Sequence, residues 1–442
     1  MSNPPLVQYA SRTDVGMRRA ANQDSPKVRL AQEDNEWERC GHLFVVADGM
    51  GGHSVGDLAS RISTDTLPMA YFKMDSESIA DRLLQAINAA NRAINDKARE
   101  NPEFADMGTT CSVLALSPQG AYAGHVGDSR VYRIRQDRIE QLTFDHSLQW
   151  EMIRQGRATI DNVDLLHPRN VITRCLGPDQ NVNIDIEGPF HVLAGDRFVI
   201  CSDGLTNHVT DAEIGAVAGH LSAADASRLL IDMTNFRGGS DNVTVVVANV
   251  EQFPEQTGNF VDSTTASDRK MADTQPFPVN RAAQSLISRL SLWVFLILAV
   301  TGLGMLAVTK TQSGLWLISA ALILGFIRFI VLTSRATIEP DSGIESFIER
   351  PLKSNLPAAK SPYRATSAEI TPELLDFLAQ AQSSLSQAAT DNGWEVDSKE
   401  LTRLSSESLE AARNNQPEKC LAARGKAIEM LMKEVYNARK HG

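Results

Sequence analysis

Four short acidic motifs hold the side chains in this chain that are best suited to chemistry. Each motif places an aspartate beside a glycine or another turn residue, and the aspartates are Asp48, Asp128, Asp203 and Asp241. Carboxylate oxygens are the ligands that Mg²⁺ and Mn²⁺ prefer in proteins. Carboxylates that share a site also repel one another and raise each other's pKa unless cations lie between them. The motifs therefore indicate a site for divalent metal ions.

Two of these aspartates come just after apolar segments. The apolar runs 43–47 and 198–201 precede Asp48 and Asp203. Runs of this kind, bounded by turn residues, are typical of buried strands, and a strand that ends in Asp-Gly delivers its carboxylate to the rim of a sheet. The alternative for any single motif is a plain hairpin turn. Four motifs together, two of them on apolar strands, favour the metal site.

The order of the motifs along the chain matches that of a known family. The matching segments are 12–16, 19–24, 46–53, 108–110, 127–130, 145–147, 172–177, 202–205 and 241–245. Across these segments the chain resembles the type 2C, metal-dependent protein serine/threonine phosphatases in their bacterial form. The resemblance does not extend to the rest of the chain.

The resemblance implies an α+β fold: a four-layer α-β-β-α sandwich of two antiparallel sheets, with the metal site at one end between the sheets. Runs of strands interleaved with pairs of helices point to the same fold class. Strands are expected at 43–47, 110–116, 121–126, 131–135, 197–201 and 242–250. A capping signal formed by Ser78 and Asp81 predicts the start of a helix.

By the same resemblance, two Mg²⁺ or Mn²⁺ ions bind at the site. Asp48 would bridge the two ions, and Gly49 would contribute its backbone carbonyl oxygen. Asp203 and Asp241 would hold one of the ions directly. A pair of ions in such a site generates hydroxide from a shared water and neutralises the phosphoryl oxygens.

The resemblance also implies roles for residues around the ions. Asp24 would orient metal-bound water without binding an ion directly. Asp128 matches the residue that bacterial members use together with Asp203 for a third, weaker ion. Arg19 matches the arginine that grips the substrate phosphate, a task that suits a planar bidentate donor. Arg18 is the alternative for that contact.

Other polar residues near the motifs have structural interpretations. Asn242 is expected to order the start of its strand, and Arg130 and Arg174 to form structural ion pairs. His125 and His146 are expected to be hydrogen-bonded residues of the core or its loops.

The chain departs from one branch of the family at the general acid. Some members carry a histidine directly after Asp-Gly, whereas this chain has Met50. His53 lies nearby at another offset, so the proton donor stays open, and a metal-bound water is one candidate. The polar segment 149–167 is expected to be irregular and corresponds to a flap that varies across the family, where loops carry specificity.

Composition restricts the partners and the compartment. The net charge of −11 argues against nucleic acid as a partner, because phosphate backbones are bound by clustered Lys and Arg. Five scattered cysteines without C-x-x-C spacing favour a reducing compartment. The N-terminus lacks a signal-peptide pattern, so the first domain is expected in the cytoplasm.

Two apolar runs in the second half of the chain predict a transmembrane hairpin. Residues 286–309 and 314–334 are each close to the ~20 residues that a helix needs to cross ~30 Å of hydrocarbon. The turn between them is short, so both flanks lie on one side of the membrane. Positive charges on both flanks place that side in the cytoplasm. The alternative is a pair of buried helices in a soluble domain.

These features divide the chain into six segments. They are a catalytic domain (1–252), a flexible linker (253–285), two transmembrane helices (286–309 and 314–334), a second linker (335–366) and a cytoplasmic helical bundle (367–442). In the bundle, Thr371 is expected to cap one helix and Gly393 to stop it. Further helices are expected at 398–414 and 417–439, which makes an αα-hairpin.

The leading hypothesis is metal-dependent hydrolysis of phosphoserine and phosphothreonine on proteins by a metal-activated water, at the cytoplasmic face of the inner membrane. The expected partners are a phosphorylated protein substrate, a serine/threonine kinase that the enzyme would oppose, and membrane lipid. One alternative is a catalytically inactive, membrane-anchored scaffold, and another is a phosphatase for a small phosphoester. The intact set of aspartates favours an enzyme over a scaffold.

Overall fold

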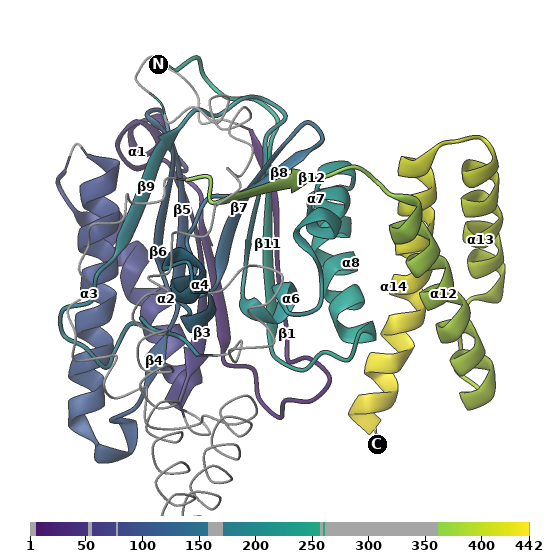
Figure 1. The fold of residues 1–442 in the computed structure, drawn as a ribbon, viewed down its shortest axis with the longest axis horizontal. Helices are drawn as coiled ribbons and strands as arrows, with labels where there is room; N and C mark the ends of the chain where they lie inside the picture. The colour runs from purple at the N-terminus through teal and green to yellow at the C-terminus, as the bar shows by residue number, and fades with distance from the viewer. Residues whose placement is uncertain are drawn as a thin grey trace, which may run out of the picture. The chain divides into compact units, whose positions relative to one another are not determined.

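Two antiparallel sheets of six strands each form the centre of the fold (Figure 1). The structure is a computed structural model that describes residues 6–51, 55–76, 78–157, 171–256, 260 and 361–441. The first sheet has the order β1 (Val7–Asp14), β11 (Val243–Val250), β10 (Arg197–Cys201), β7 (Arg130–Arg135), β8 (Arg138–Gln141) and β12 (Arg364–Ser367). The second has the order β2 (Asp24–Arg29), β3 (His42–Met50), β5 (Cys111–Ser117), β6 (Gly120–Val126) and β9 (Asp185–Phe190), with β4 (Gly108–Thr109) paired to β3.

The two sheets pack face to face through an apolar core. On β3, Phe44 and Val46 belong to this core, whereas Leu43 and Val45 belong to the core on the other face of the sheet. This alternation follows from the period of two in a strand. It explains why the central strands are apolar throughout: both of their faces are buried.

Helices cover the outer face of each sheet. α2 (Val55–Lys73) and α3 (Ile79–Glu100) pack on the second sheet, and α7 (Asp211–His220) and α8 (Ala223–Phe236) on the first (Figure 1). The shorter helices are α1 (Asp34–Cys40), η1 (Pro102–Phe104), α4 (Leu148–Arg154) and α6 (Asp203–Thr206). The α+β class with two antiparallel sheets is therefore confirmed.

The expected local signals are present where the structure describes them. The side chain of Ser78 accepts a hydrogen bond from the backbone N–H of Asp81 at the start of α3. Residues 148–154 form α4, capped by Ser147, so the expectation of an irregular segment from 149 onward was wrong for its first part. A favourable cap at the start of this short helix outweighed the polar composition.

Three helices follow in the C-terminal segment: α12 (Pro372–Asn392), α13 (Ser398–Arg413) and α14 (Pro417–His441). Thr371 caps α12, and Gly393 ends it in the left-handed conformation with φ of 64°, both as expected. Residues 364–366 of the expected second linker belong to β12, which pairs with β8 at the edge of the first sheet. The C-terminal segment thus lies in the same compact unit as the two sheets.

The two expected transmembrane helices, 286–309 and 314–334, lie outside the described residues, as does nearly all of the linker before them. Among the helices that the structure does describe, none combines the length and the apolar character needed to cross a bilayer.

Candidate metal centre

Asp24 and Asp48 face each other across neighbouring strands. They are register partners in the antiparallel pair β2–β3, at the end of β3 that carries the Asp-Gly motif. Directly opposed positions on paired strands bring side chains within contact range. The strand register therefore places two of the predicted site residues side by side.

Asp203 and Asp241 meet through the other sheet. Asp203 begins α6 just after β10, and Asp241 lies just before β11, the strand that pairs with β10. A Cβ on Gly204 would lie 1.9 Å from the carbonyl oxygen of Asn242, so only glycine allows the two motifs to approach this closely. Burial, followed by the charge of Asp241, raises the pKa of Asp203.

The electrostatics show that all five predicted carboxylates share one region. Burial is the largest cause that raises the pKa of Asp48 well above its usual range, and the charges of Asp24, Asp203, Asp128 and Asp241 raise it further. Burial likewise raises the pKa of Asp24 to about 7. Like charges in one site disfavour ionisation, and a cation reverses that effect.

Unsatisfied oxygens indicate what such a cation would find. Asp24, Asp128 and Asp203 each have one buried carboxylate oxygen that accepts no hydrogen bond from the residues that the structure describes. Buried polar atoms are nearly always satisfied, so each exception needs an explanation. Oxygen donors with free lone pairs fit hard divalent cations such as Mg²⁺ and Mn²⁺.

The carboxylates are not yet arranged as a finished coordination shell. Within the described ranges, no three Asp, Glu, His or Cys side chains converge closely enough to hold an ion as they stand. The structure brings the predicted ligands together, while the individual roles of bridging, direct and water-mediated ligand stay predictions.

Ser202 is a residue of the site that sequence reasoning missed. Its hydroxyl donates to Oδ2 of Asp24 at 2.7 Å and accepts from the backbone N–H of Thr244 at 2.9 Å. This links β2 of one sheet to β10 and β11 of the other. The signal was available, because Ser202 directly precedes Asp203 in the third acidic motif.

Thr110 holds the backbone of Asp48 in place. Its hydroxyl accepts from the N–H of Asp48 at 2.9 Å, and its own N–H donates to the carbonyl of Asp48 at 2.8 Å. The same hydroxyl lies 2.8 Å from Oγ of Ser129, next to Asp128. Thr110 and Ser129, which are 62 and 81 residues downstream of Asp48, therefore fix its position.

Arg19 lies at the rim of the carboxylate region. Its guanidinium Nη2 donates to Oδ2 of Asp241 at 2.8 Å, and its side chain is 51% exposed. A half-exposed guanidinium beside a metal-binding region can bind a substrate phosphate. The contact of Arg19 with substrate phosphate stays a prediction.

Asn242 orders the loop that leads to Arg19. Its Nδ2 donates to the carbonyls of Val15 and Ala21, both at 2.9 Å, and its Oδ1 accepts from the N–H of Gln23 at 2.9 Å. The expected structural role is correct, and it extends beyond the strand to the segment from 15 to 23. The side-chain oxygen is already engaged, so Asn242 is not a free metal ligand.

The two arginines and two histidines that were expected to have structural roles make structural contacts. Arg130 forms a buried ion pair with Asp145, Nη2 to Oδ2 at 2.7 Å, and Arg174 pairs with Asp185, Nη1 to Oδ1 at 3.1 Å. His125 bonds to the hydroxyl of Ser112 and the carbonyl of Gly127. His146 bonds to the N–H of Gly127 and the carboxylate of Asp185. Met50 lies at the end of β3, whereas His53 and residues 158–167 of the flap lie outside the described residues.

Comparison with known proteins identifies relatives of this chain. A family model described as protein phosphatase 2C matches residues 18–237. Protein phosphatase PhpP of Streptococcus pneumoniae is 31% identical over 245 residues, which are 54% of this chain and 96% of PhpP.

Similar solved structures are also found. The crystal structure of the Mycobacterium tuberculosis serine/threonine phosphatase PstP/Ppp is 31% identical, with a TM-score of 0.50 over 56% of this chain and 99% of that one. A structure of the PstP catalytic domain in complex with two manganese ions, also 31% identical, has a TM-score of 0.48 over the same shares.

Proposed function

This chain belongs to the protein phosphatase 2C family and is a serine/threonine protein phosphatase of that type; from this premise we propose that the five-carboxylate site hydrolyses phosphoserine and phosphothreonine in phosphoproteins at a membrane surface. The assignment of the site rests on five carboxylates that share one region beside Arg19, namely Asp24, Asp48, Asp128, Asp203 and Asp241. Asp24, Asp128 and Asp203 each have a buried oxygen that lacks a donor among the described residues.

The family depends on Mg²⁺ or Mn²⁺, and the donor set of this chain fits such ions. Asp48, Asp203 and Asp241 would hold two ions, with Gly49 contributing its carbonyl oxygen and Asp128 available for a third. When bound, the ions supply a hydroxide nucleophile at neutral pH and neutralise charge on the phosphoryl group.

The residues of the chain contribute binding and orientation. Asp24, whose Oδ2 accepts a hydrogen bond from Ser202 and whose Oδ1 has no donor among the described residues, would orient water at the site. Arg19 exchanges its bond to Asp241 for the substrate phosphate, so that binding of the substrate also frees that carboxylate. This exchange keeps the guanidinium paired in both states, which lowers the cost of binding.

The membrane location rests on the sequence. Two apolar runs, 286–309 and 314–334, with positive charges outside both ends support a hairpin anchor in the inner membrane with the catalytic domain in the cytoplasm. Fractionation of cells that express the full chain tests this. Recovery in the soluble fraction without detergent would rule out the anchor.

The expected counterpart is a serine/threonine kinase, because only such an enzyme creates the substrate. A small phosphoester is the second candidate substrate, and the exposed guanidinium of Arg19 could bind the phosphate of either substrate. The kcat/KM of the full chain for phosphothreonine and phosphoserine peptides, compared with p-nitrophenyl phosphate, separates the two candidates. A preference for the peptides supports the proposal. Equal or lower kcat/KM for peptides of varied sequence would exclude it.

A further inference from the structure

The C-terminal helix α14 is fastened to the catalytic domain. Leu421, Ile428 and Leu431 of α14 are buried in the same apolar core as Leu229 and Leu230 of α8. Burial of this many large apolar side chains makes a stable helix–helix contact. The C-terminal segment therefore has a fixed place against the part of the domain that leads to the site.

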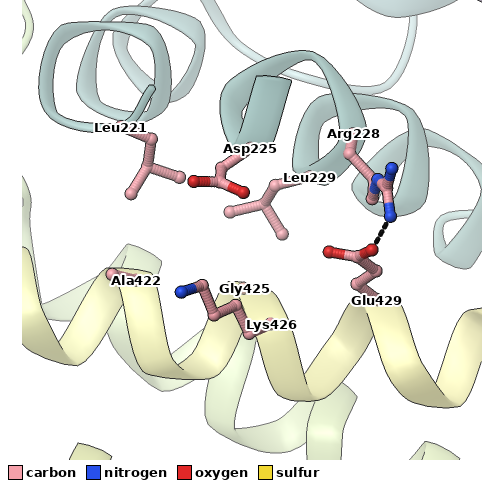
Figure 2. Close-up of a pocket in the computed structure, with 8 residues that line it drawn as sticks. All are labelled: Leu221, Asp225, Arg228, Leu229, Ala422, Gly425, Lys426 and Glu429. Carbon is pink, nitrogen blue, oxygen red and sulfur yellow. Dashed lines mark ion pairs between the residues drawn. The ribbon is translucent and has the colours of Figure 1, made fainter. Parts of the chain in front are cut away.

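Figure 2 shows part of this contact. Gly425 lies under Leu229, and a Cβ at Gly425 would be 3.2 Å from Cδ2 of Leu229, so the two helices are close together there. An ion pair between Arg228 and Glu429 crosses the interface beside it (Figure 2). The orientation of α14 on α8 is thus set by both packing and charge.

Further along α14, Tyr436 joins a chain of hydrogen bonds that ends in the Arg19 loop. Its hydroxyl donates to Oδ1 of Asp232 at 2.6 Å and accepts from Nδ2 of Asn235 at 3.1 Å. The same Nδ2 donates to Oδ1 of Asp14 at 3.0 Å, and that oxygen also accepts from the N–H of Gly16 at 2.8 Å. Tyr436 is therefore connected to the turn that follows β1.

One turn later, Arg439 contacts the loop directly. Its guanidinium donates through Nη1 to the carbonyl of Gly16 and through Nη2 to the carbonyl of Arg19, the latter at 3.2 Å. The planar guanidinium group of Arg439 thus acts as a fork that bonds to both ends of the segment 16–19. Charge-assisted bonds from a guanidinium are among the stronger hydrogen bonds in proteins.

The position of the loop 16–19 affects the site, because the loop packs against the predicted metal ligand Asp241. A Cβ on Gly16 would lie 2.1 Å from the carbonyl of Asp241, and the N–H of Met17 donates to the carbonyl of Gly239 at 2.7 Å. Arg19 then reaches Oδ2 of Asp241 at 2.8 Å. A displacement of the loop would move Arg19 relative to the carboxylates.

We propose that Tyr436 and Arg439 are positioning residues for phosphate binding: α14 completes the loop 16–19 and so orients Arg19 from the far end of the chain. The kinetic consequence rests on the proposed function, whereas the effect on the loop does not. The C-terminal segment thereby acts as part of the catalytic unit.

The test compares variants of the full chain. Arg439→Ala removes the fork, Arg439→Lys keeps the charge but not the fork, and Tyr436→Phe removes one hydroxyl. Lys433→Ala is the matched control, since Lys433 is an exposed cation on the same helix. The KM for a phosphothreonine peptide should rise about five- to tenfold in Arg439→Ala and less in the other two, with kcat little changed. The control should match the wild type.

Amide hydrogen exchange provides a readout that does not depend on activity. Exchange in a peptide covering residues 14–19 should be faster in Arg439→Ala than in the wild type or in Lys433→Ala, because the loop loses two of its hydrogen bonds. Unchanged exchange would overturn the proposal. An unchanged or lowered KM in Arg439→Ala would also overturn it, the latter by showing that α14 obstructs the site.

The two proposals can fail separately. If the wild-type chain releases no phosphate from any phosphopeptide with Mn²⁺ present, the proposed function fails, and hydrogen exchange alone decides whether α14 positions the loop. If the wild type is active and neither Arg439→Ala nor Arg439→Lys differs from it in KM or in exchange, the positioning role is refuted.

Discussion

Asp48 is the central carboxylate of the site, since the charges of four other aspartates raise its pKa. Its backbone is fixed by Thr110, so a side-chain change need not disturb β3. Asp48→Asn keeps the shape and removes the charge, and turnover should fall by at least about a hundredfold while the circular dichroism spectrum is retained. A near-normal kcat in a folded variant would show that Asp48 only forms a turn.

Arg19 should contribute to binding more than to the chemical step. Arg19→Ala removes the half-exposed guanidinium beside Asp241, and the KM for a phosphopeptide should rise about tenfold with a smaller effect on kcat. Arg18→Ala is the matched control and tests the alternative considered for the phosphate contact. A larger KM effect in Arg18→Ala would transfer the role to Arg18.

Asp232 makes stability depend on pH. Burial raises its pKa to about 7, and Asp14 adds to the rise, against the opposing effects of the Tyr436 hydroxyl, Arg228 and Arg12. A carboxyl with a raised pKa binds its proton more tightly when folded, so its contribution to stability is full at low pH and is lost as pH rises through about 7.

The matching experiment uses Asp232→Asn, which still accepts a hydrogen bond from Tyr436. The Tm of the wild type minus that of Asp232→Asn should decrease as pH rises from 5 to 8. The other carboxylates titrate equally in both proteins and cancel in the difference. A difference in Tm that is independent of pH would contradict the raised pKa.

At the scale of elements, the start of α6 must fit closely against the end of the Asp241 motif. Gly204→Ala would place a methyl group 1.9 Å from the carbonyl of Asn242, so the backbone at this position must move. Asp203, the preceding residue, would move with it. We expect a loss of about 1–3 kcal/mol in stability, typical of overpacking, and weaker Mn²⁺ binding by calorimetry.

Gly219→Ala is the control for that variant. Gly219 lies in α7, where an added Cβ would be 3.5 Å from Cγ2 of Ile134, an ordinary contact. Because alanine favours helix, Gly219→Ala should be neutral or slightly stabilising. Equal behaviour of the two variants would show that the tight approach at Gly204 does not matter.

The elements also show how far the sequence predicts the fold. All six expected strands are present, because the expected strands lie deep in the two sheets and read as apolar runs. The strands β1, β2, β4, β8, β9 and β12 were not expected. β1 is largely exposed, and β12 consists of four residues with an alanine as its one apolar member, so neither has an apolar run to reveal it.

At the scale of the whole molecule, the acidic motifs predicted which carboxylates meet, but not what surrounds them. α12 and α14 each have an apolar face, on which Leu378 and Leu431 are fully buried. An apolar helix face does not specify its partner, so the packing of α14 on α8 was not predictable. The contact of Arg439 with a loop 423 residues earlier depends on that packing.

The most direct test of the account is metal dependence of phosphate release by the full chain in detergent. With a phosphothreonine peptide and Mn²⁺, inorganic phosphate should be released; after exhaustive chelation with EDTA the release should stop, and added Mn²⁺ should restore it. Asp203→Asn should need more Mn²⁺ for half-maximal rate. Undiminished release in EDTA would contradict the central claim that these carboxylates act by holding metal ions.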